Sequence, residues 1–211
     1  MSKPDPVQQA LERLGELRHA TLTDQVVNEV RHSLRNRSNL VIAKAAKVAG
    51  ELQAKALVPD LVASFHKLMK DPARLDKRCA ALTEIVTALY ELDCHDPQPF
   101  LTGLRHVQME GSFGPPVDAA AKLRGLCAQG LLRTTHKNSL DEVVRLLVDR
   151  EPEARMGAVR ALATNGAEAG VLLLKLKVYS GDPEPEVLGE CFTGLLAAAP
   201  ERSLELVCGS P

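Results

Sequence analysis

Three neighbouring residues, Cys94, His95 and Asp96, form a run of potential metal ligands. A metal site needs three or four ligand atoms that converge on one point. Side chains of adjacent residues diverge, so we expect a polar turn between helices here and no metal site. The other cysteines are widely spaced and no Cys-x-x-Cys pair occurs, which argues against a zinc ribbon or a redox motif. We expect Cys79, Cys127 and Cys191 to be small buried apolar residues.

Common catalytic signatures are absent from the sequence. It contains no Gly-x-Ser-x-Gly turn, no Gly-x-x-x-x-Gly-Lys-[Ser/Thr] phosphate loop and no His-Glu-x-x-His metal helix. The six histidines are scattered, and the glycine-bearing loop at 111–114 fits neither phosphate motif. We therefore expect no catalytic residue, no cofactor and no metal, and a protein that is not an enzyme.

Basic residues are concentrated in one part of the chain. The whole chain has 26 Lys and Arg, 27 Asp and Glu and a net charge of −1, whereas residues 31–78 hold eleven basic and four acidic residues. This segment is either a docking surface for an acidic protein segment or nucleic acid, or a solvated face with internal pairing, as for Lys47, Glu51 and Lys55 at i, i+4 spacing. Duplex binders usually carry a domain-wide basic excess, so we favour a protein partner.

The composition predicts a helical protein that must position these residues. Hydrophobic residues make up 45%, charged residues 25% and aromatic residues 3%, with no Trp. This composition argues against disorder, and the shortage of aromatic residues argues against an all-β fold. The abundant Ala, Leu, Glu, Lys and Arg favour helices. No stretch alternates apolar and polar residues convincingly, so we predict no strand.

A repeated pattern runs along the chain. Glu-Pro-Glu at 151–153 recurs at 184–186, and in each copy an aspartate, Asp149 or Asp182, lies two residues before it. Related stretches begin at Ser38, Asp71 and Pro115. The last large apolar residues of the five copies lie 33, 41, 36 and 33 residues apart, at Leu52, Ile85, Leu126, Leu162 and Leu195. Periods of this size indicate stacked helical hairpins.

Each copy predicts a pair of helices. Ser38 and Asp71 suit the start of a first helix because their oxygens accept a hydrogen bond from a free N–H, and proline suits a first turn. In the second helices, apolar residues recur at i, i+3 and i+4, which predicts one buried face. These stripes comprise apolar residues within 57–69, then Leu140, Val143, Val144 and Leu147, and then Leu172, Leu173, Leu176 and Tyr179.

Further helices are predicted at both ends of the chain. Apolar spacing indicates helices over 6–17 and 21–34, and Pro200 opens a short final helix with Leu204 and Val207. The prediction is therefore an all-α protein of twelve helices in six antiparallel pairs. The N-terminal segment has no continuous apolar stretch, so we expect no membrane span and a cytoplasmic protein.

The pattern Asp-x-x-Pro-Glu-x-Arg-x-x-Ala-x-x-Ala-Leu resembles a HEAT repeat. Residues 149–163 match it most closely, with Asp149, Pro152, Arg155 and Leu162 in the expected positions. Residues 182–197 depart from it where Leu188 replaces the arginine, and residues 71–85 keep Arg78 at the matching position. The resemblance implies a ladder of bonds between the Asp and Arg of successive repeats, in which Asp149, Arg155 and Asp182 could take part.

The resemblance also implies the overall architecture, a right-handed α-α superhelix. It covers residues 38–199 and extends to a single domain over 1–211, with 1–37 as an N-terminal capping pair and 199–211 as a C-terminal cap and tail. Proteins of this family include scaffolds, adaptors, transport receptors and a few enzymes. We expect a monomeric, non-catalytic scaffold or adaptor that binds another protein along the concave surface formed by the second helices.

Candidate contacts follow from this placement. The polar contacts expected on the second helices are His66, Lys67, Lys70, Arg105, His106 and Arg145. The 41-residue interval adds a loop that includes 109–114, in which Phe113 is either an exposed anchor or folds back on the core. The alternative function is a nucleic-acid-binding or base-processing HEAT-like module that uses segment 31–78. The shortage of aromatic residues makes stacking on bases difficult and disfavours this alternative.

Overall fold

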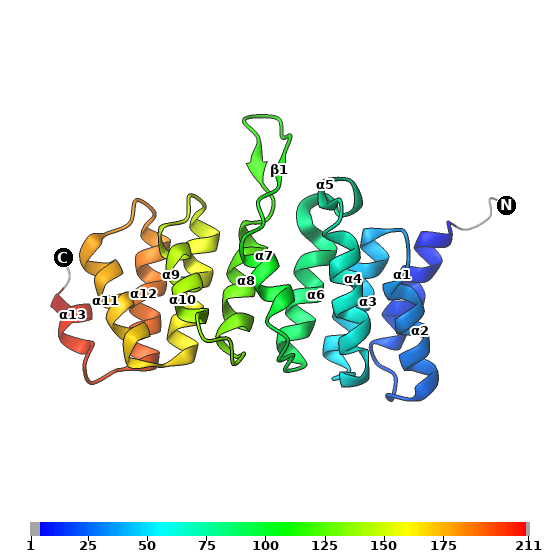
Figure 1. The fold of residues 1–211 in the computed structure, drawn as a ribbon, viewed down its shortest axis with the longest axis horizontal. Coiled ribbons are helices and arrows are strands. Elements are labelled where there is room, and N and C mark those ends of the chain that lie inside the picture. The colour runs from blue at the N-terminus through cyan, green and yellow to red at the C-terminus, as the bar shows by residue number, and fades with distance from the viewer. Residues whose placement is uncertain (1–4, 210–211) are drawn as a thin grey trace. The chain divides into compact units, whose positions relative to one another are not determined.

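The computed structural model describes residues 5–209, apart from the side chains of 205, 207 and 208. In this part of the chain, the secondary structure consists of helices, joined by turns and loops, and one short hairpin (Figure 1). The predicted all-α class is confirmed. The chain divides into two compact units, and the predicted single domain stays a prediction. Unit 1 comprises the residues up to Cys94 together with Val107–Ala120, and unit 2 comprises His95–His106 together with the residues from Ala121 onward. The side chain of Val207, which was predicted as an apolar residue of the final helix, lies outside the described residues.

Unit 1 is built around helix α3. Its helices are α1 (Pro6–Leu17), α2 (Asp24–Leu34), α3 (Asn39–Glu51), α4 (Val58–Leu68), the one-turn α5 (Pro72–Leu75) and α6 (Ala80–Glu91), with 3-10 turns at Lys55–Leu57 and Lys77–Cys79. Helix α3 packs against α1, α2 and α6, and α4 packs against α2 and α6. Small buried residues such as Ala45, Ala46 and Ala49 let these helices approach closely.

The first helix pair forms much as predicted. Helix α1 spans the predicted residues, and the side chain of Asp5 accepts a hydrogen bond from the Val7 N–H at 3.0 Å. Helix α2 begins three residues later than predicted because Thr23 caps it, accepting from the Val26 N–H at 3.3 Å. In the second pair, the predicted stripe of α4 is buried at Leu61, Phe65 and Leu68.

The helix predicted from Asp71 is interrupted, which corrects the sequence prediction. It splits into α5 and α6, and between them Arg78 and Cys79 have left-handed φ angles of 62° and 50°. The break arises because the buried Asp76 carboxylate accepts from the Ala81 and Leu82 N–H groups at 2.9 and 2.8 Å and so starts a new helix. Arg78 is therefore exposed rather than placed in a ladder.

A hairpin replaces the beginning of the helix predicted from Pro115, and it also corrects the prediction of no strand. Strands β1 (Met109–Glu110) and β2 (Val117–Asp118) pair antiparallel, with Met109 opposite Asp118. The two consecutive prolines of the loop between them donate no N–H, and the residue before each is disfavoured in a helix. The hairpin lies at the side of unit 1 where α5 lies and α6 begins (Figure 1).

Unit 2 is a second set of neighbouring helices. Its elements are α7 (Gln98–Leu104), α8 (Ala121–Leu132), α9 (Ser139–Val144), a 3-10 turn at Arg145–Val148, α10 (Pro152–Asn165), α11 (Glu168–Ser180), α12 (Pro185–Ala198) and α13 (Leu204–Gly209). Helix α8 packs against α7 and α10, and α10 packs against α11 and α12. At the crossing of α8 and α10, a Cβ added to Gly125 would lie 2.9 Å from the Gly157 Cα, so the two backbones touch.

Buried Arg–Asp pairs join successive first helices of unit 2. Arg155 of α10 donates to both carboxylate oxygens of Asp182 at 2.7 and 2.8 Å, which confirms that predicted rung. Asp149 is bound by Arg124 of α8 at 2.8 and 3.0 Å, a partner that the sequence analysis missed. Arg124 follows Asp118 by six residues, as Arg155 follows Asp149, and this spacing could have identified it.

The buried face of α11 differs from the prediction. The structure buries Gly170, Val171 and Leu174, whereas Leu172, Leu176 and Tyr179 of the predicted stripe are 54%, 59% and 72% exposed. Apolar residues occur around most of this helix, so periodicity alone did not select its face. Gly170 helps to fix the orientation, because a Cβ there would lie 3.1 Å from the Leu162 carbonyl oxygen.

Candidate binding surface on the second helices

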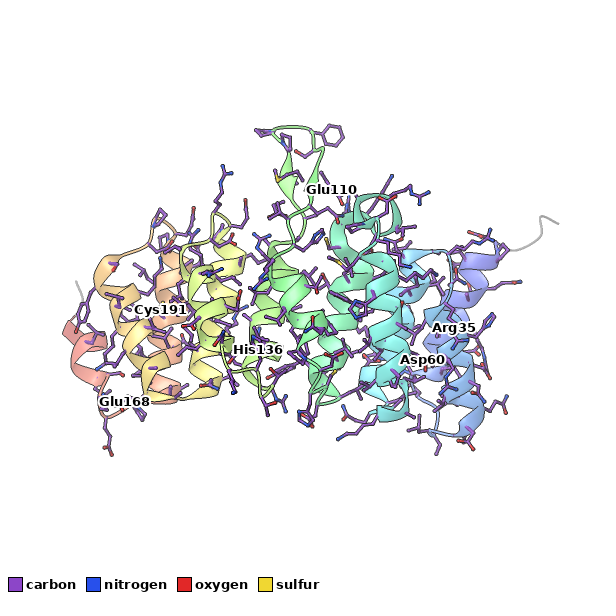
Figure 2. All side chains as sticks on the ribbon, in the orientation of Figure 1. Arg35, Asp60, Glu110, His136, Glu168 and Cys191 are labelled. Atoms are coloured by element: carbon purple, nitrogen blue, oxygen red, sulfur yellow. The ribbon has the colours of Figure 1, made fainter. Side chains whose placement is uncertain are left out.

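The carboxylate of Asp60 connects the second helices of unit 1. Its oxygens accept hydrogen bonds from Arg31 Nε at 2.9 Å and from Arg35 Nη2 at 3.1 Å, which links α4 to α2 (Figure 2). The side chain of Asp60 is 14% exposed, and that of Arg35 is 71% exposed. Arg35 thus keeps most of its guanidinium available to solvent while the carboxylate holds it in place.

The C-terminal end of α2 is satisfied by side chains of α4. The Ser64 hydroxyl donates to the Leu34 carbonyl oxygen at 3.0 Å, and Lys67 Nζ donates to the carbonyl oxygens of Arg35 and Asn36 at 3.3 Å each. The last carbonyls of a helix have no partner within the helix, so these bonds stabilise the α2–α4 contact. They also bring the C-terminal ends of the two helices together.

Six basic or titratable side chains lie on these two helices or directly after them, and we call them the α2–α4 basic surface. They are Arg31, Arg35, Arg37, His66, Lys67 and Lys70. Within the described part of the chain, Arg37 and Lys70 form no ion pair and no side-chain hydrogen bond. A small pocket of about 120 Å³ lies between Arg35, Asp60 and Lys67. Among the described residues, Asp60 is the one carboxylate that forms an ion pair with this surface.

The predicted residues of unit 2 gather around a different carboxylate. Arg105, directly after α7, binds Glu142 of α9 through Nη2 at 2.5 Å and through Nε at 3.2 Å. Hydrogen bonding from Arg105 lowers the pKa of Glu142, and the charges of Arg145 and His136 lower it further. His106 has a structural contact, because its carbonyl oxygen accepts from Arg124 Nη1 at 3.0 Å.

Phe113 lies at the loop of the hairpin and is fully exposed. Of the two expectations for this residue, the exposed side chain is the one found. Three further apolar residues of the hairpin segment are also more than half exposed, namely Val107, Met109 and Val117.

Sequence reasoning found only part of each surface. His66, Lys67 and Lys70 all lie at the C-terminal half of α4 or just beyond it, and Arg105 and Arg145 lie in unit 2. The two carboxylates that bind these cations, Asp60 and Glu142, were not predicted from the sequence. The spacing of Arg31 and Arg35 by four residues was the available signal for the first, because it places both on one helix face.

No group of three His, Cys, Asp or Glu side chains suited to a metal ion occurs in the part of the chain that the structure describes. Cys94 is buried, whereas His95 and Asp96 are exposed, and Asp96 accepts from the Gln98 N–H. Burial raises the pKa of the Cys127 thiol and raises that of Cys191 to about 11. Both thiols therefore stay protonated near neutral pH.

No helix among residues 5–209 is both long and apolar enough to cross a bilayer. No model of a known protein family matches the chain, and no curated protein is significantly similar to it. The resemblance to HEAT repeats consequently depends on the paired helices and on the Arg–Asp contacts at repeated spacing.

Proposed function

We propose that the protein is a non-catalytic interaction module that binds an acidic segment of another protein on the α2–α4 basic surface. The observation that carries the proposal is the cluster of cations at α2 and α4: Arg31 and Arg35 bind the mostly buried carboxylate of Asp60, and Lys67 bonds to the end of α2 beside them. Arg37 and Lys70 follow directly after the two helices. Opposite charges speed association and select partners, even where each exposed pair adds little affinity. Two of the cations, Arg37 and Lys70, need no internal bond to be broken before they bind.

We also propose that the helix pairs form a HEAT-like solenoid. The Arg124–Asp149 and Arg155–Asp182 pairs support this assignment, because each joins a first helix to the aspartate before the next one. Repeats of this type present a row of second helices for recognition of a partner. A scaffold or adaptor role along that row is then the expected use of the α2–α4 basic surface.

The proposal is tested with a fluorescent peptide rich in Asp and Glu and a neutral peptide of equal length. The wild type should bind the acidic peptide, and affinity should fall as salt rises. Reversing the two cations without internal partners, with Arg37→Glu and Lys70→Glu together, should weaken binding at least tenfold. A control with Lys47→Glu and Lys122→Glu changes the net charge equally at exposed positions elsewhere and should leave binding nearly unchanged.

The same titration separates the nucleic-acid alternative. A single-stranded RNA and a duplex DNA are measured beside the peptides at low and moderate salt. Tight, salt-sensitive binding of either nucleic acid with no binding of the acidic peptide would favour the alternative and overturn the proposal. Equal loss of peptide binding in both double variants would also overturn it, because net charge alone would then explain the attraction.

A further inference from the structure

The turn that precedes α6 has an unfavourable backbone conformation. Arg78 and Cys79 are consecutive non-glycine residues with φ angles of 62° and 50°. A side chain in the left-handed region crowds its own backbone, so such residues persist only where surrounding contacts hold them. Two in succession indicate that specific contacts stabilise this turn.

The stem of the hairpin supplies those contacts. Glu110 Oε1 accepts a hydrogen bond from the Arg78 N–H at 2.6 Å and a second from Gln108 Nε2 at 2.6 Å. Gln108 Nε2 also donates to the carbonyl oxygen of Asp76 at 3.0 Å. Figure 2 shows Glu110 in the stem, on the side of the hairpin that lies nearest α5. Bonds to a charged carboxylate are among the stronger hydrogen bonds of proteins.

The same turn organises the beginning of α6. The Asp76 side chain is fully buried, and besides the Ala81 and Leu82 N–H groups it accepts from Asn39 Nδ2 of α3 at 3.0 Å. Two sets of contacts therefore meet at the segment 76–79. The hairpin binds the backbone of this segment, and the side chain of Asp76 caps α6 and joins that helix to α3. A change at the stem is positioned to alter the first turn of α6.

We propose that the hairpin is a strap, in which Glu110 is the positioning residue that keeps the turn at 76–79 in its left-handed conformation. When Glu110 releases the Arg78 N–H, the turn relaxes and the first turn of α6 opens more often. The exposed loop around Phe113 takes no part in holding the turn, so the strap acts through its stem alone. The hydrogen bonds of the hairpin stem and the stability of the first turn of α6 are thus coupled.

Amide hydrogen exchange of the full chain, resolved by residue, tests the strap. Glu110→Ala should speed exchange at Ala81 and Leu82 at least tenfold and leave the amides of α1 unchanged. Glu110→Gln keeps an acceptor oxygen and should remain within threefold of the wild type. Phe113→Ala, which changes the same hairpin without touching its stem, should match the wild type.

A glycine substitution shows whether backbone strain is what the strap opposes. Arg78→Gly removes the crowding, because glycine adopts positive φ readily. In that background Glu110→Ala should speed exchange at Ala81 and Leu82 by less than threefold. The proposal is overturned if Glu110→Ala alone leaves these amides at wild-type rates, if Phe113→Ala has the same effect, or if Arg78→Gly does not reduce the effect.

Discussion

At the scale of single residues, the most constrained charge is Asp182. Its side chain is completely buried and accepts from Arg155, from Lys177 Nζ at 2.7 Å and from the Glu184 N–H. Burial by itself would raise the pKa of Asp182, but these hydrogen bonds outweigh it and lower the pKa to about 2. A buried carboxylate is favourable only when it is paired. The bonds that pair Asp182 come from α10, from α11 and from the residue before α12, so this carboxylate joins the three helices.

This environment predicts a dependence of stability on acid. The folded pKa of Asp182 is about 2 against an ordinary value of 3.8, so the folded state binds fewer protons. Its contribution to the free energy of unfolding, about 2 kcal/mol, is present above pH ~4 and is lost as pH falls toward ~2. Urea unfolding between pH 2 and 5 should show this loss in the wild type.

The matched variant for this prediction is Asp182→Asn, which cannot ionise. It should destabilise the protein by about 3 kcal/mol at neutral pH, because Arg155 and Lys177 lose their counter-charge. Its unfolding free energy should change less between pH 4 and 2 than that of the wild type. Identical acid dependence in the two proteins would contradict the assignment of this charge.

At the scale of secondary-structure elements, the contact of α8 with α10 depends on two glycines. Gly125 and Gly157 face each other with their Cα atoms in contact, next to the buried Arg124 and Arg155. The absence of a Cβ on both residues lets α8 and α10 approach closely, and Arg124 of α8 binds Asp149, which precedes α10. The close approach and this ion pair therefore join the same two helices.

The close contact of α8 and α10 predicts that one added methyl group at Gly157 destabilises the protein. Gly157→Ala should lower the free energy of unfolding by about 2 kcal/mol, because the new Cβ forces two helix backbones apart. The control is Gly189→Ala in α12, whose Cβ would meet nothing within 4 Å. Alanine favours helix over glycine by about 1 kcal/mol, so this control should stabilise the protein. Urea denaturation of both variants measures whether the free energy of unfolding falls, as expected for Gly157→Ala, or rises, as expected for Gly189→Ala.

At the scale of the whole molecule, the two units have separate cores. Each helix packs mainly against helices of its own unit, so a local defect should loosen the unit that contains it. Unit 1 has its core around α3 and α6, whereas unit 2 has its core around α8, α10 and α12. Stability of the two is therefore expected to respond to mutation separately.

Hydrogen exchange checks this independence. Gly157→Ala should speed amide exchange in α8 and α10 several-fold while the amides of α3 keep wild-type rates. The reverse experiment uses Ala45→Val in α3, because Ala45 is a small buried residue and a larger side chain would crowd the neighbouring helices. This variant should speed amide exchange in α3 while the amides of α8 and α10 keep wild-type rates. Equal acceleration throughout the chain in either variant would show one cooperative unit and contradict the prediction.

The sequence predicted the helical class and most helix positions, because these follow from local spacing, whereas the Arg155–Asp182 rung was implied by the resemblance to HEAT repeats. It failed where a tertiary contact decides the local structure. Asp76 reads as one more residue of a helix until its burial and its bonds to α6 are known, and α11 carries too many leucines for periodicity to choose a face. The cations of the α2–α4 basic surface were partly found, but the organising role of Asp60 depends on which helices become neighbours.

The Arg–Asp ladder limits how the protein can be divided into shorter fragments. The loop at 166–167 between α10 and α11 looks like a convenient place to truncate, but the carboxylate that neutralises Arg155 lies beyond it, at Asp182. A fragment ending there would lose the Asp182 carboxylate and helices α11 and α12, which pack against α10, and would leave the Arg155 guanidinium without its counter-charge. A fragment that keeps α10 must therefore continue through Glu184, whose N–H completes the bonding of Asp182.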